Sequence, residues 1–140
     1  MEEDKTKHFV GKIAQKAIIV RDKKIFVMKG IGDEIWEFPG GRLHAGEEPI
    51  DGLKRELTEE LGVEVQNLKP FWFGRSLHTK TNTWRVLAVW LGALPKSAKL
   101  KVAKAEVQEC KWITLAELKK LPMYEDCGRA AKAYVSTIQK

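Results

Sequence analysis

Four of the five glutamates in the stretch 41–63, which reads GRLHAGEEPIDGLKRELTEELGV, have a spacing that could do chemistry, namely Glu47, Glu56, Glu59 and Glu60. If the later part of this stretch is helical, Glu56, Glu59 and Glu60 share one face, because positions three and four apart are neighbours on a helix. Like charges placed in this way repel one another by roughly 0.2–0.5 kcal/mol per pair. A bound cation would remove that cost, and carboxylate oxygens suit hard cations such as Mg²⁺ and Mn²⁺, which also take phosphate oxygens as ligands. The alternative is an acidic helix face that solvent alone neutralises.

The spacing of the whole stretch favours the cation site over the solvated face. It resembles the Nudix box, and every fixed position of that pattern is filled, namely by Gly41, Glu47, Arg55, Glu56, Leu57, Glu59, Glu60, Gly62 and Val63. The preceding segment 36–40 (WEFPG) is similar to the one before the box in MutT-like members of the family. The resemblance implies an α/β fold, the Nudix fold, in which helices cover both faces of a curved mixed sheet in an α/β/α sandwich and the box forms a loop, a helix and a second loop.

The resemblance also implies roles for individual residues. Glu56, Glu59 and Glu60 match the glutamates that hold Mg²⁺, for which Mn²⁺ is a possible substitute, and Gly40 matches a position whose carbonyl joins them. Glu47 would be a supporting ligand or an orienting carboxylate. Arg55 lies about 100° around the helix from Glu56. Its guanidinium can therefore pair with Glu47 or Glu59 and fix their side chains.

The general base is less well defined by the sequence. In members of the family it comes either from the box or from a later loop. The segment 106–112 resembles the family's E-x-x-E-x-x-W stretch, with Glu106 and Glu109 as its two acids. We expect Glu56 to be the first candidate for the base and Glu106 the second, as base or as an auxiliary metal ligand. The alternative for Glu106 and Glu109 is a polar strand edge.

Four residues before or within the box are candidates for binding substrate. Lys29 could reach a phosphate from the end of its strand, although a solvated lysine would look the same. Gly41 follows another glycine, and such a pair lets the backbone approach a ligand closely. Phe38 is a further candidate for the substrate site. The aromatic rings of Trp36, Phe73 and Trp84 could stack on a base. Packing in the core is the alternative for at least two of these three rings.

The family's reaction implies water attack on the phosphorus of a nucleoside diphosphate linked to another group. The MutT-like segment favours a nucleoside triphosphate, cleaved to the monophosphate and pyrophosphate. However, MutT proteins that remove oxidised purines carry a base-reading asparagine after a Leu-Pro or Phe-Pro, and here 121–125 reads LPMYE. Specificity for 8-oxo-guanine is therefore in doubt. The alternatives are a nucleotide-sugar or ADP-ribose hydrolase and a non-catalytic Nudix-like module that binds a nucleotide.

The sequence around the box predicts the strands and helices that hold the box in place. Strands are expected at 13–20, 25–28, 35–38, 63–77 with a break at Pro70, 83–91 and 106–113, and helices at 49–61, 115–121 and 125–138. In the box helix, Ile50, Leu53, Leu57 and Leu61 form an apolar stripe that should dock on the sheet, while the glutamates face elsewhere. Gly62 should end this helix, and Gly52 within it predicts close packing.

Length and composition indicate one domain, 1–140, whose charged first eight residues are expected to fray. A net charge of +6 suits an anionic ligand, and we expect a small-molecule nucleotide.

The lysine-rich segment 95–105 is better explained as a solvated loop than as a nucleic-acid site. Cys110 and Cys127 have no metal-ligand spacing, and the longest apolar run is half a membrane span, so a cytoplasmic protein with free thiols and no membrane partner is expected. Monomer and homodimer both remain open.

Overall fold

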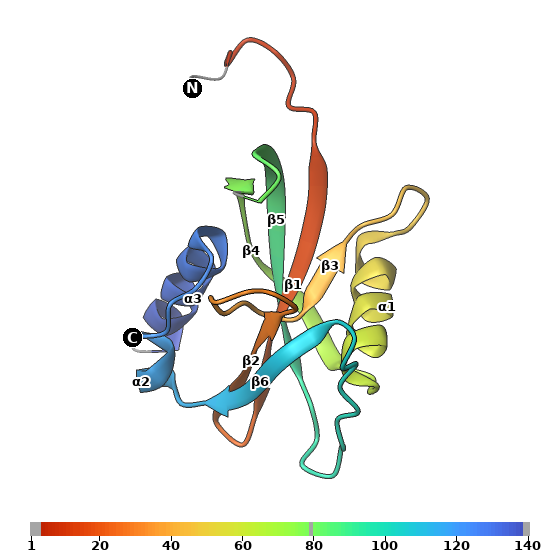
Figure 1. Cartoon of the computed structure of the whole chain (residues 1–140), viewed down its shortest axis with the longest axis vertical. Coiled ribbons are helices and arrows are strands. Elements are labelled where there is room, and N and C mark those ends of the chain that lie inside the picture. The colour runs from red at the N-terminus through yellow and green to blue at the C-terminus, as the bar shows by residue number, and fades with distance from the viewer. Residues whose placement is uncertain (1–3, 79, 139–140) are drawn as a thin grey trace.

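The computed structural model describes residues 4–78 and 80–138 and builds them into a curved six-stranded sheet between helices (Figure 1). The strands run in the order β4-β5-β1-β2-β6, and β3 pairs with β1 beside this path. The β1–β5 pair is parallel, whereas the other pairs are antiparallel, so the sheet is mixed as expected. The elements are β1 (Lys12–Arg21), β2 (Lys24–Gly30), β3 (Gly40–Arg42), α1 (Pro49–Leu61), β4 (Gln66–His78), β5 (Thr83–Ala93), β6 (Val107–Ile113), α2 (Leu115–Leu118) and α3 (Glu125–Ile138).

Two hydrophobic cores separate the layers, one on each face of the sheet. Alternate residues of β1 point to opposite faces, so Ala17 and Ile19 pack with the leucines of α1 while Ala14 and Ile18 pack with α3. Figure 1 shows α1 on one side of the sheet and α2 and α3 on the other. The predicted α/β/α sandwich is confirmed, and the apolar run of β1 is explained by burial on both faces.

The box helix α1 has the boundaries that its sequence predicts. Pro49 occupies the first turn, where its missing N–H costs nothing, and Gly62 adopts the left-handed conformation (φ 67°) that closes the helix. Leu53, Leu57 and Leu61 are each at most 1% exposed. A Cβ placed on Gly52 would lie 2.9 Å from a methyl carbon of Leu43, so the expected close packing is present.

The structure differs from the expected elements at four places. Residues 35–38 form only isolated bridges, because Trp36 and Glu37 pair with two different segments, through Met123 and Met28. Gly40–Arg42, where no strand is expected from the sequence, pairs with β1 as strand β3. The strand β4 passes through Pro70 with a shift in register instead of ending there, which an edge strand tolerates because one side of its backbone needs no partner. Helix α2 is shorter than predicted, although Thr114 and Glu117 form the expected capping box.

Of the eight residues expected to fray, 1–3 lie outside the described residues, and 4–8 are exposed. Both cysteines are free, with Cys110 exposed and Cys127 buried. Among the described residues, no helix has the length and apolar character needed to cross a bilayer.

Asp126 ties the start of α3 to the sheet. Its carboxylate accepts hydrogen bonds from the Ser76 hydroxyl (2.7 Å) and from Arg85 (3.0 Å), and the residue is 3% exposed. Burial raises the pKa of Asp126, but the hydrogen bond from Ser76 and the charge of Arg85 outweigh that effect and place the pKa below 3.8. The ionised carboxylate therefore stabilises the folded chain above the unfolded pKa, and this contribution is lost as the pH falls through the folded pKa.

We expect Asp126→Asn to lower the free energy of unfolding by about 2 kcal/mol at pH 7, because Arg85 loses a charged, buried partner. Urea unfolding at several pH values would measure the difference between the variant and the wild type. That difference should shrink below about pH 4, where the wild-type carboxylate takes up its proton on unfolding. A difference that stays constant down to pH 2.5 would contradict the electrostatic explanation.

Candidate active site

The glycines of β3 hold the carboxylates of α1 against the sheet. The backbone N–H of Gly40 donates to Glu60 Oε1 at 2.7 Å. A Cβ placed on Gly41 would lie 2.3 Å from the carboxyl carbon of Glu56, so this carboxylate rests directly against the glycine backbone. Two acids from the helix and two consecutive glycines from a strand thus meet at one place. With a larger residue at 41, the Glu56 side chain would have to move from this position.

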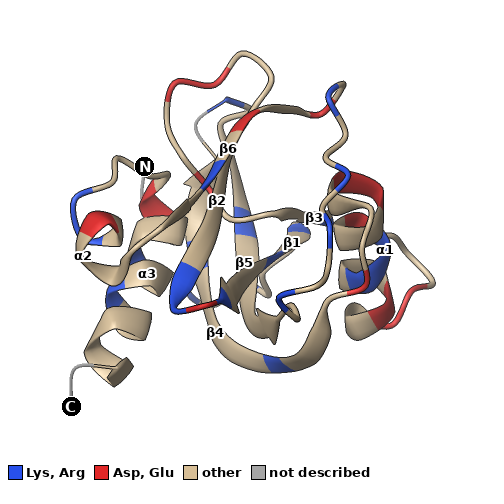
Figure 2. Ribbon diagram, turned by 90° about the horizontal axis from the view of Figure 1, so that it is seen from below, with Lys and Arg blue, Asp and Glu red and all other residues tan. Residues whose placement is uncertain are grey.

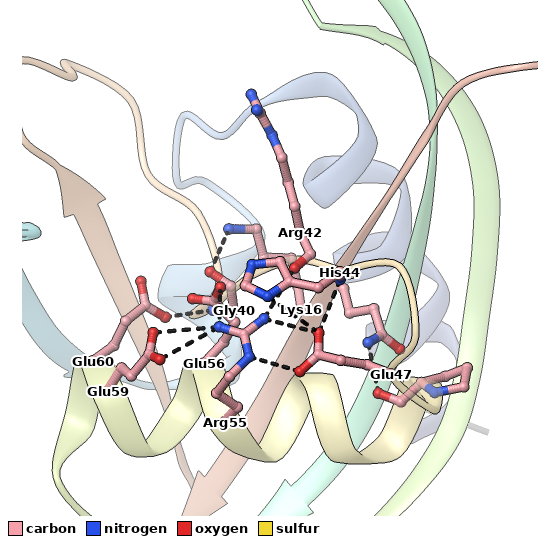
Figure 3. A network of polar contacts seen from close by, with 11 residues as sticks. Lys16, Gly40, Arg42, His44, Glu47, Arg55, Glu56, Glu59 and Glu60 are labelled. Carbon is pink, nitrogen blue, oxygen red and sulfur yellow. Dashed lines mark hydrogen bonds and ion pairs between the residues drawn. The ribbon is translucent and has the colours of Figure 1, made fainter.

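Arg55 connects the loop and the helix of the box. Its guanidinium donates to Glu47 from Nε (2.7 Å) and Nη2 (3.1 Å), and to Glu56 from Nη1 (2.9 Å), with Glu59 at 3.4 Å (Figure 3). Pairing with Glu47 or Glu59 is expected from the sequence; both contacts are present, and Glu56 is an additional partner. The hydrogen bond from Arg55, followed by the backbone N–H of His44, lowers the pKa of Glu47 to about 2. Arg55 therefore holds the side chains of Glu47 and Glu56, and more loosely that of Glu59, in fixed positions.

We expect Arg55→Gln to lower kcat about 10- to 100-fold while the melting temperature changes little. Glutamine cannot replace the forked contacts to Glu47 and Glu56, and groups that orient metal ligands typically contribute this much to activity. Steady-state rates and circular dichroism melts would be compared with those of Lys54→Gln, a neighbouring exposed cation of the same helix. Equal rates for Arg55→Gln and the wild type would show that the network does not position the carboxylates.

Glu60 departs from the predicted arrangement of the helix. It is 6% exposed and belongs to the buried side of α1, so the expectation that all three helical glutamates face away from the leucine stripe is wrong for this residue. Glu56 is partly buried and Glu59 is exposed. Burial is the main reason that the pKa of Glu60 rises, to about 7. Its place at the edge of the stripe follows from the Gly40 N–H, which supplies a buried partner for the carboxylate.

The donor set around Gly40 and Gly41 fits a hard divalent cation. Glu56, Glu59, Glu60 and the Gly40 carbonyl offer oxygens only, which is the ligand type of Mg²⁺ and Mn²⁺. Within residues 4–78 and 80–138, no three acidic, histidine or cysteine side chains already converge on one point. In this conformation the Arg55 guanidinium lies among Glu47, Glu56 and Glu59 (Figure 3).

A cavity of about 170 Å³ lies beside Gly41, on the face of the sheet that carries α3. Most of its lining is charged or polar. Two opposite-charge contacts join lining residues to each other, Lys16 to Glu37 and Lys80 to Asp33. A third joins Arg85 of the lining to Asp126, which does not line the cavity. The Tyr124 hydroxyl also donates to Asp33 (2.9 Å). The lining residues are Ala14, Lys16, Asp33, Glu37, Gly41, Arg42, His78, Lys80, Arg85, Tyr124 and Cys127.

The candidates for substrate binding separate into two groups. Gly41 lines the cavity as expected. Phe38 is 0% exposed and Trp36 is 6% exposed, and both belong to the core under α3, so their rings are not available to a ligand in this structure. Lys29 lies over the Trp36 ring at 4.8 Å and 3.8 Å from Glu109, and it does not line the cavity. Each of Trp36, Phe38 and Lys29 has a partner within the fold, and its role in substrate binding stays a prediction.

Glu106 lies in the turn before β6, at the end of a loop that is attached to α1. The backbone N–H groups of Lys101 and Ala103 donate to the carbonyls of Leu61 and Glu60, both at 2.8 Å. The structure therefore brings this loop next to the helix, as a late-loop base would require. The side chain of Glu106 is exposed, and among the described residues no hydrogen bond or ion pair joins it to the box glutamates. Its role as base or ligand stays a prediction.

Sequence reasoning missed the cavity residues outside the box, above all Lys16 and Asp33. The one available signal was a charged residue inside an apolar strand, because Lys16 interrupts the run of β1. A buried lysine needs a partner, and that partner, Glu37, is distant in sequence. Arg85, Tyr124 and His78 come from separate segments and gave no local signal.

Comparisons with known proteins agree with the geometry. The family model described as NUDIX domain matches residues 12–134. An 8-oxo-dGTP diphosphatase of Buchnera aphidicola subsp. Schizaphis graminum is 30% identical over 107 residues, covering 73% of this chain and 76% of that protein. An RNA pyrophosphohydrolase of Blochmanniella floridana is 32% identical over 78 residues, and the chain spans about half of it (49%).

Solved structures share the fold at lower identity. The MutT NUDIX hydrolase of Burkholderia pseudomallei superposes with a TM-score of 0.76 at 22% identity, covering 87% of this chain and 96% of that one. At this identity the likeness concerns the fold. The family match covers most of the chain and includes the complete box. The chain therefore belongs to the NUDIX domain family, as a MutT-like hydrolase.

Proposed function

We propose that this protein is a Mg²⁺-dependent pyrophosphohydrolase that cleaves a nucleoside triphosphate to the monophosphate and pyrophosphate. The observation that carries the proposal is the meeting of Glu56 and Glu60 with the backbone of Gly40 and Gly41, directly beside a cavity. Family membership makes the chain a hydrolase of phosphoric anhydride bonds. The relative named 8-oxo-dGTP diphosphatase supports a triphosphate as the substrate.

In this proposal the box supplies the cation site and the cavity supplies the substrate site. Glu56, Glu59 and Glu60, together with the Gly40 carbonyl, would hold Mg²⁺, which neutralises phosphate charge and acidifies a bound water. Arg55 keeps Glu56 in place through a 2.9 Å contact. The polar cavity beside Gly41 would receive the group next to the cleaved bond.

Glu56 is our first candidate for the general base and Glu106 the second. Glu56 is partly buried against Gly41, and a base must lie within hydrogen-bond reach of the attacking water. In the present conformation the Glu56 carboxylate accepts a hydrogen bond from Arg55. Glu106 has the exposure and the nearby loop position that a mobile second acid would need.

A substrate panel tests the proposed function. Nucleoside triphosphates, including 8-oxo-dGTP, would be incubated with the protein and with Mg²⁺, Mn²⁺ or EDTA, beside ADP-ribose and a nucleotide sugar. We expect pyrophosphate release from a triphosphate that stops in EDTA. Release of a sugar phosphate would favour the ADP-ribose or nucleotide-sugar alternative. Nucleotide binding without turnover under either metal would favour a non-catalytic module.

RNA with a 5′-triphosphate is a second candidate substrate. The relative named RNA pyrophosphohydrolase supports it, and so does the net charge of +6. The same panel can include a short 5′-triphosphorylated RNA. A kcat/KM for the RNA that exceeds the value for GTP and that falls steeply with added salt would favour this substrate over free nucleotides.

A further inference from the structure

Lys16 is a buried cation at the boundary between the box and the cavity. It lies in the middle of β1, where its register partner in β3 is Gly40, and its side chain is 9% exposed. The ammonium lies 2.7 Å from Glu37 Oε1. It also lies 3.3 Å from the Gly40 carbonyl oxygen (Figure 3). Lys16 thus contacts the same carbonyl that we assign to the cation site, and it also lines the cavity.

The ammonium has an unused donor. A lysine ammonium carries three N–H groups, and the described residues provide acceptors for two of them, on Glu37 and Gly40. Leaving a charged donor without an acceptor in a buried place is costly. The cavity is the open space that this side chain borders, so a ligand in the cavity can supply the third acceptor.

Charge in the cavity favours an anionic ligand. Asp33 and Asp126 are engaged by Lys80 and Arg85, and Glu37 is engaged by Lys16. Arg42 also lines the cavity, and within residues 4–78 and 80–138 it has no ion pair. In Figure 3 its side chain extends away from the box glutamates. The balance of charge on the walls is therefore positive.

We propose that Lys16 contacts the diphosphate group of the substrate and is a binding residue of the active site. This inference rests on the proposed function, because it places the diphosphate next to the Gly40 carbonyl. In this arrangement Lys16 brings a fixed positive charge from the sheet to the diphosphate, in addition to the charge of the cation held by the helix. A purely structural ion pair between Lys16 and Glu37 is the alternative, and it predicts no effect on phosphate binding in a variant that stays folded.

Isothermal titration with inorganic pyrophosphate tests the inference without turnover, in EDTA and again with Mg²⁺. The variant is Lys16→Met, which keeps the length of the side chain and removes its charge. The control is Lys12→Met, an exposed lysine of the same strand that does not line the cavity. Because Lys16→Met leaves the carboxylate of Glu37 unpaired and 15% exposed, the double variant Lys16→Met/Glu37→Gln is measured beside it. Adenosine is titrated as a probe that lacks phosphate.

We expect Lys16→Met to weaken pyrophosphate binding about 10- to 100-fold, the range for one charged hydrogen bond. Lys12→Met should bind like the wild type, and adenosine binding should not change. Unchanged pyrophosphate binding in a folded Lys16 variant, no binding by the wild type under either condition, or weaker binding of adenosine alone would each overturn the inference. If neither Lys16 variant folds, the residue is structural and the inference also falls. Hydrolysis of the substrate panel is measured separately, so failure of the proposed function is a different result.

Discussion

Glu59→Gln is expected to lower the rate of hydrolysis about 100- to 1,000-fold and to leave the melting temperature unchanged. A divalent metal contributes several kcal/mol to stabilising the charge of the transition state, and each 1.36 kcal/mol corresponds to a factor of ten in rate. Glutamine removes the negative charge that would hold the metal. It removes nothing from the core, because Glu59 lies on the exposed face of α1 and its side chain is 48% exposed. Initial rates measure the loss of activity, a Mn²⁺ titration measures metal binding, and circular dichroism melts measure the melting temperature.

The matched control for this prediction is Glu64→Gln. Glu64 is exposed and follows the box helix, so its substitution makes the same change of charge without touching the site. A rate for Glu59→Gln equal to that of Glu64→Gln would show that Glu59 holds no metal. A lower melting temperature for Glu59→Gln would make the residue structural. Figure 2 shows acidic residues along α1, which is why a control close to the helix is needed to remove any general effect of charge.

The burial of Glu60 makes the effect of Glu60→Gln on activity harder to interpret than that of Glu59→Gln. The resemblance to the Nudix box implies the same role for Glu59 and Glu60, as carboxylates that hold the cation. Glu60 is buried and accepts the Gly40 N–H at 2.7 Å, so its substitution changes a buried hydrogen bond as well as a charge. A loss of activity in Glu60→Gln would thus combine both effects. Glu59 is the cleaner test of metal binding.

The box predicted the helix and its ends because its signals are local. Pro49 and Gly62 act through their own backbone angles, and Leu53, Leu57 and Leu61 act through a period that any helix shares. The same reasoning predicted Arg55 between the glutamates, since their spacing on a helix determines which side chains can meet. Local rules were sufficient wherever the partner lies within a turn or two of the same element.

The cavity could not be predicted because its walls come from distant parts of the chain. Lys16 meets Glu37 only after β1 and the following loops have folded together, and Asp33 meets Tyr124 across most of the sequence. The same limit applies to Trp36 and Phe38, whose burial could not be decided from the local sequence. Their rings follow a strand and precede the box in sequence, but α3, from the far end of the chain, covers that face of the sheet.

The glycine pair of β3 carries the strictest structural requirement in the site. Gly40 has φ 140°, a conformation that other residues rarely adopt. A Cβ at this position would lie 2.0 Å from the carbonyl oxygen of Gln15 and 2.8 Å from the Cα of Lys16. Both atoms belong to the backbone of β1, the strand at the centre of the sheet, so neither can move aside. At Gly41 the corresponding contact is with the side chain of Glu56, which can rotate away.

Gly40→Ala is therefore expected to lower the free energy of unfolding by at least about 3 kcal/mol, because strained backbone and overpacking each cost about 1–3 kcal/mol. Urea unfolding and thermal melts measure this, and a fall of roughly 10 °C in melting temperature corresponds to it. The control is Gly128→Ala in α3, where a Cβ meets nothing within 4 Å. That variant should be as stable as the wild type or slightly more stable, since alanine suits a helix better than glycine. A Gly40→Ala protein that melts with the wild type would mean that β3 can separate from β1, and the carboxylates of Glu56 and Glu60 would then lose the rigid support on which the proposed cation site depends.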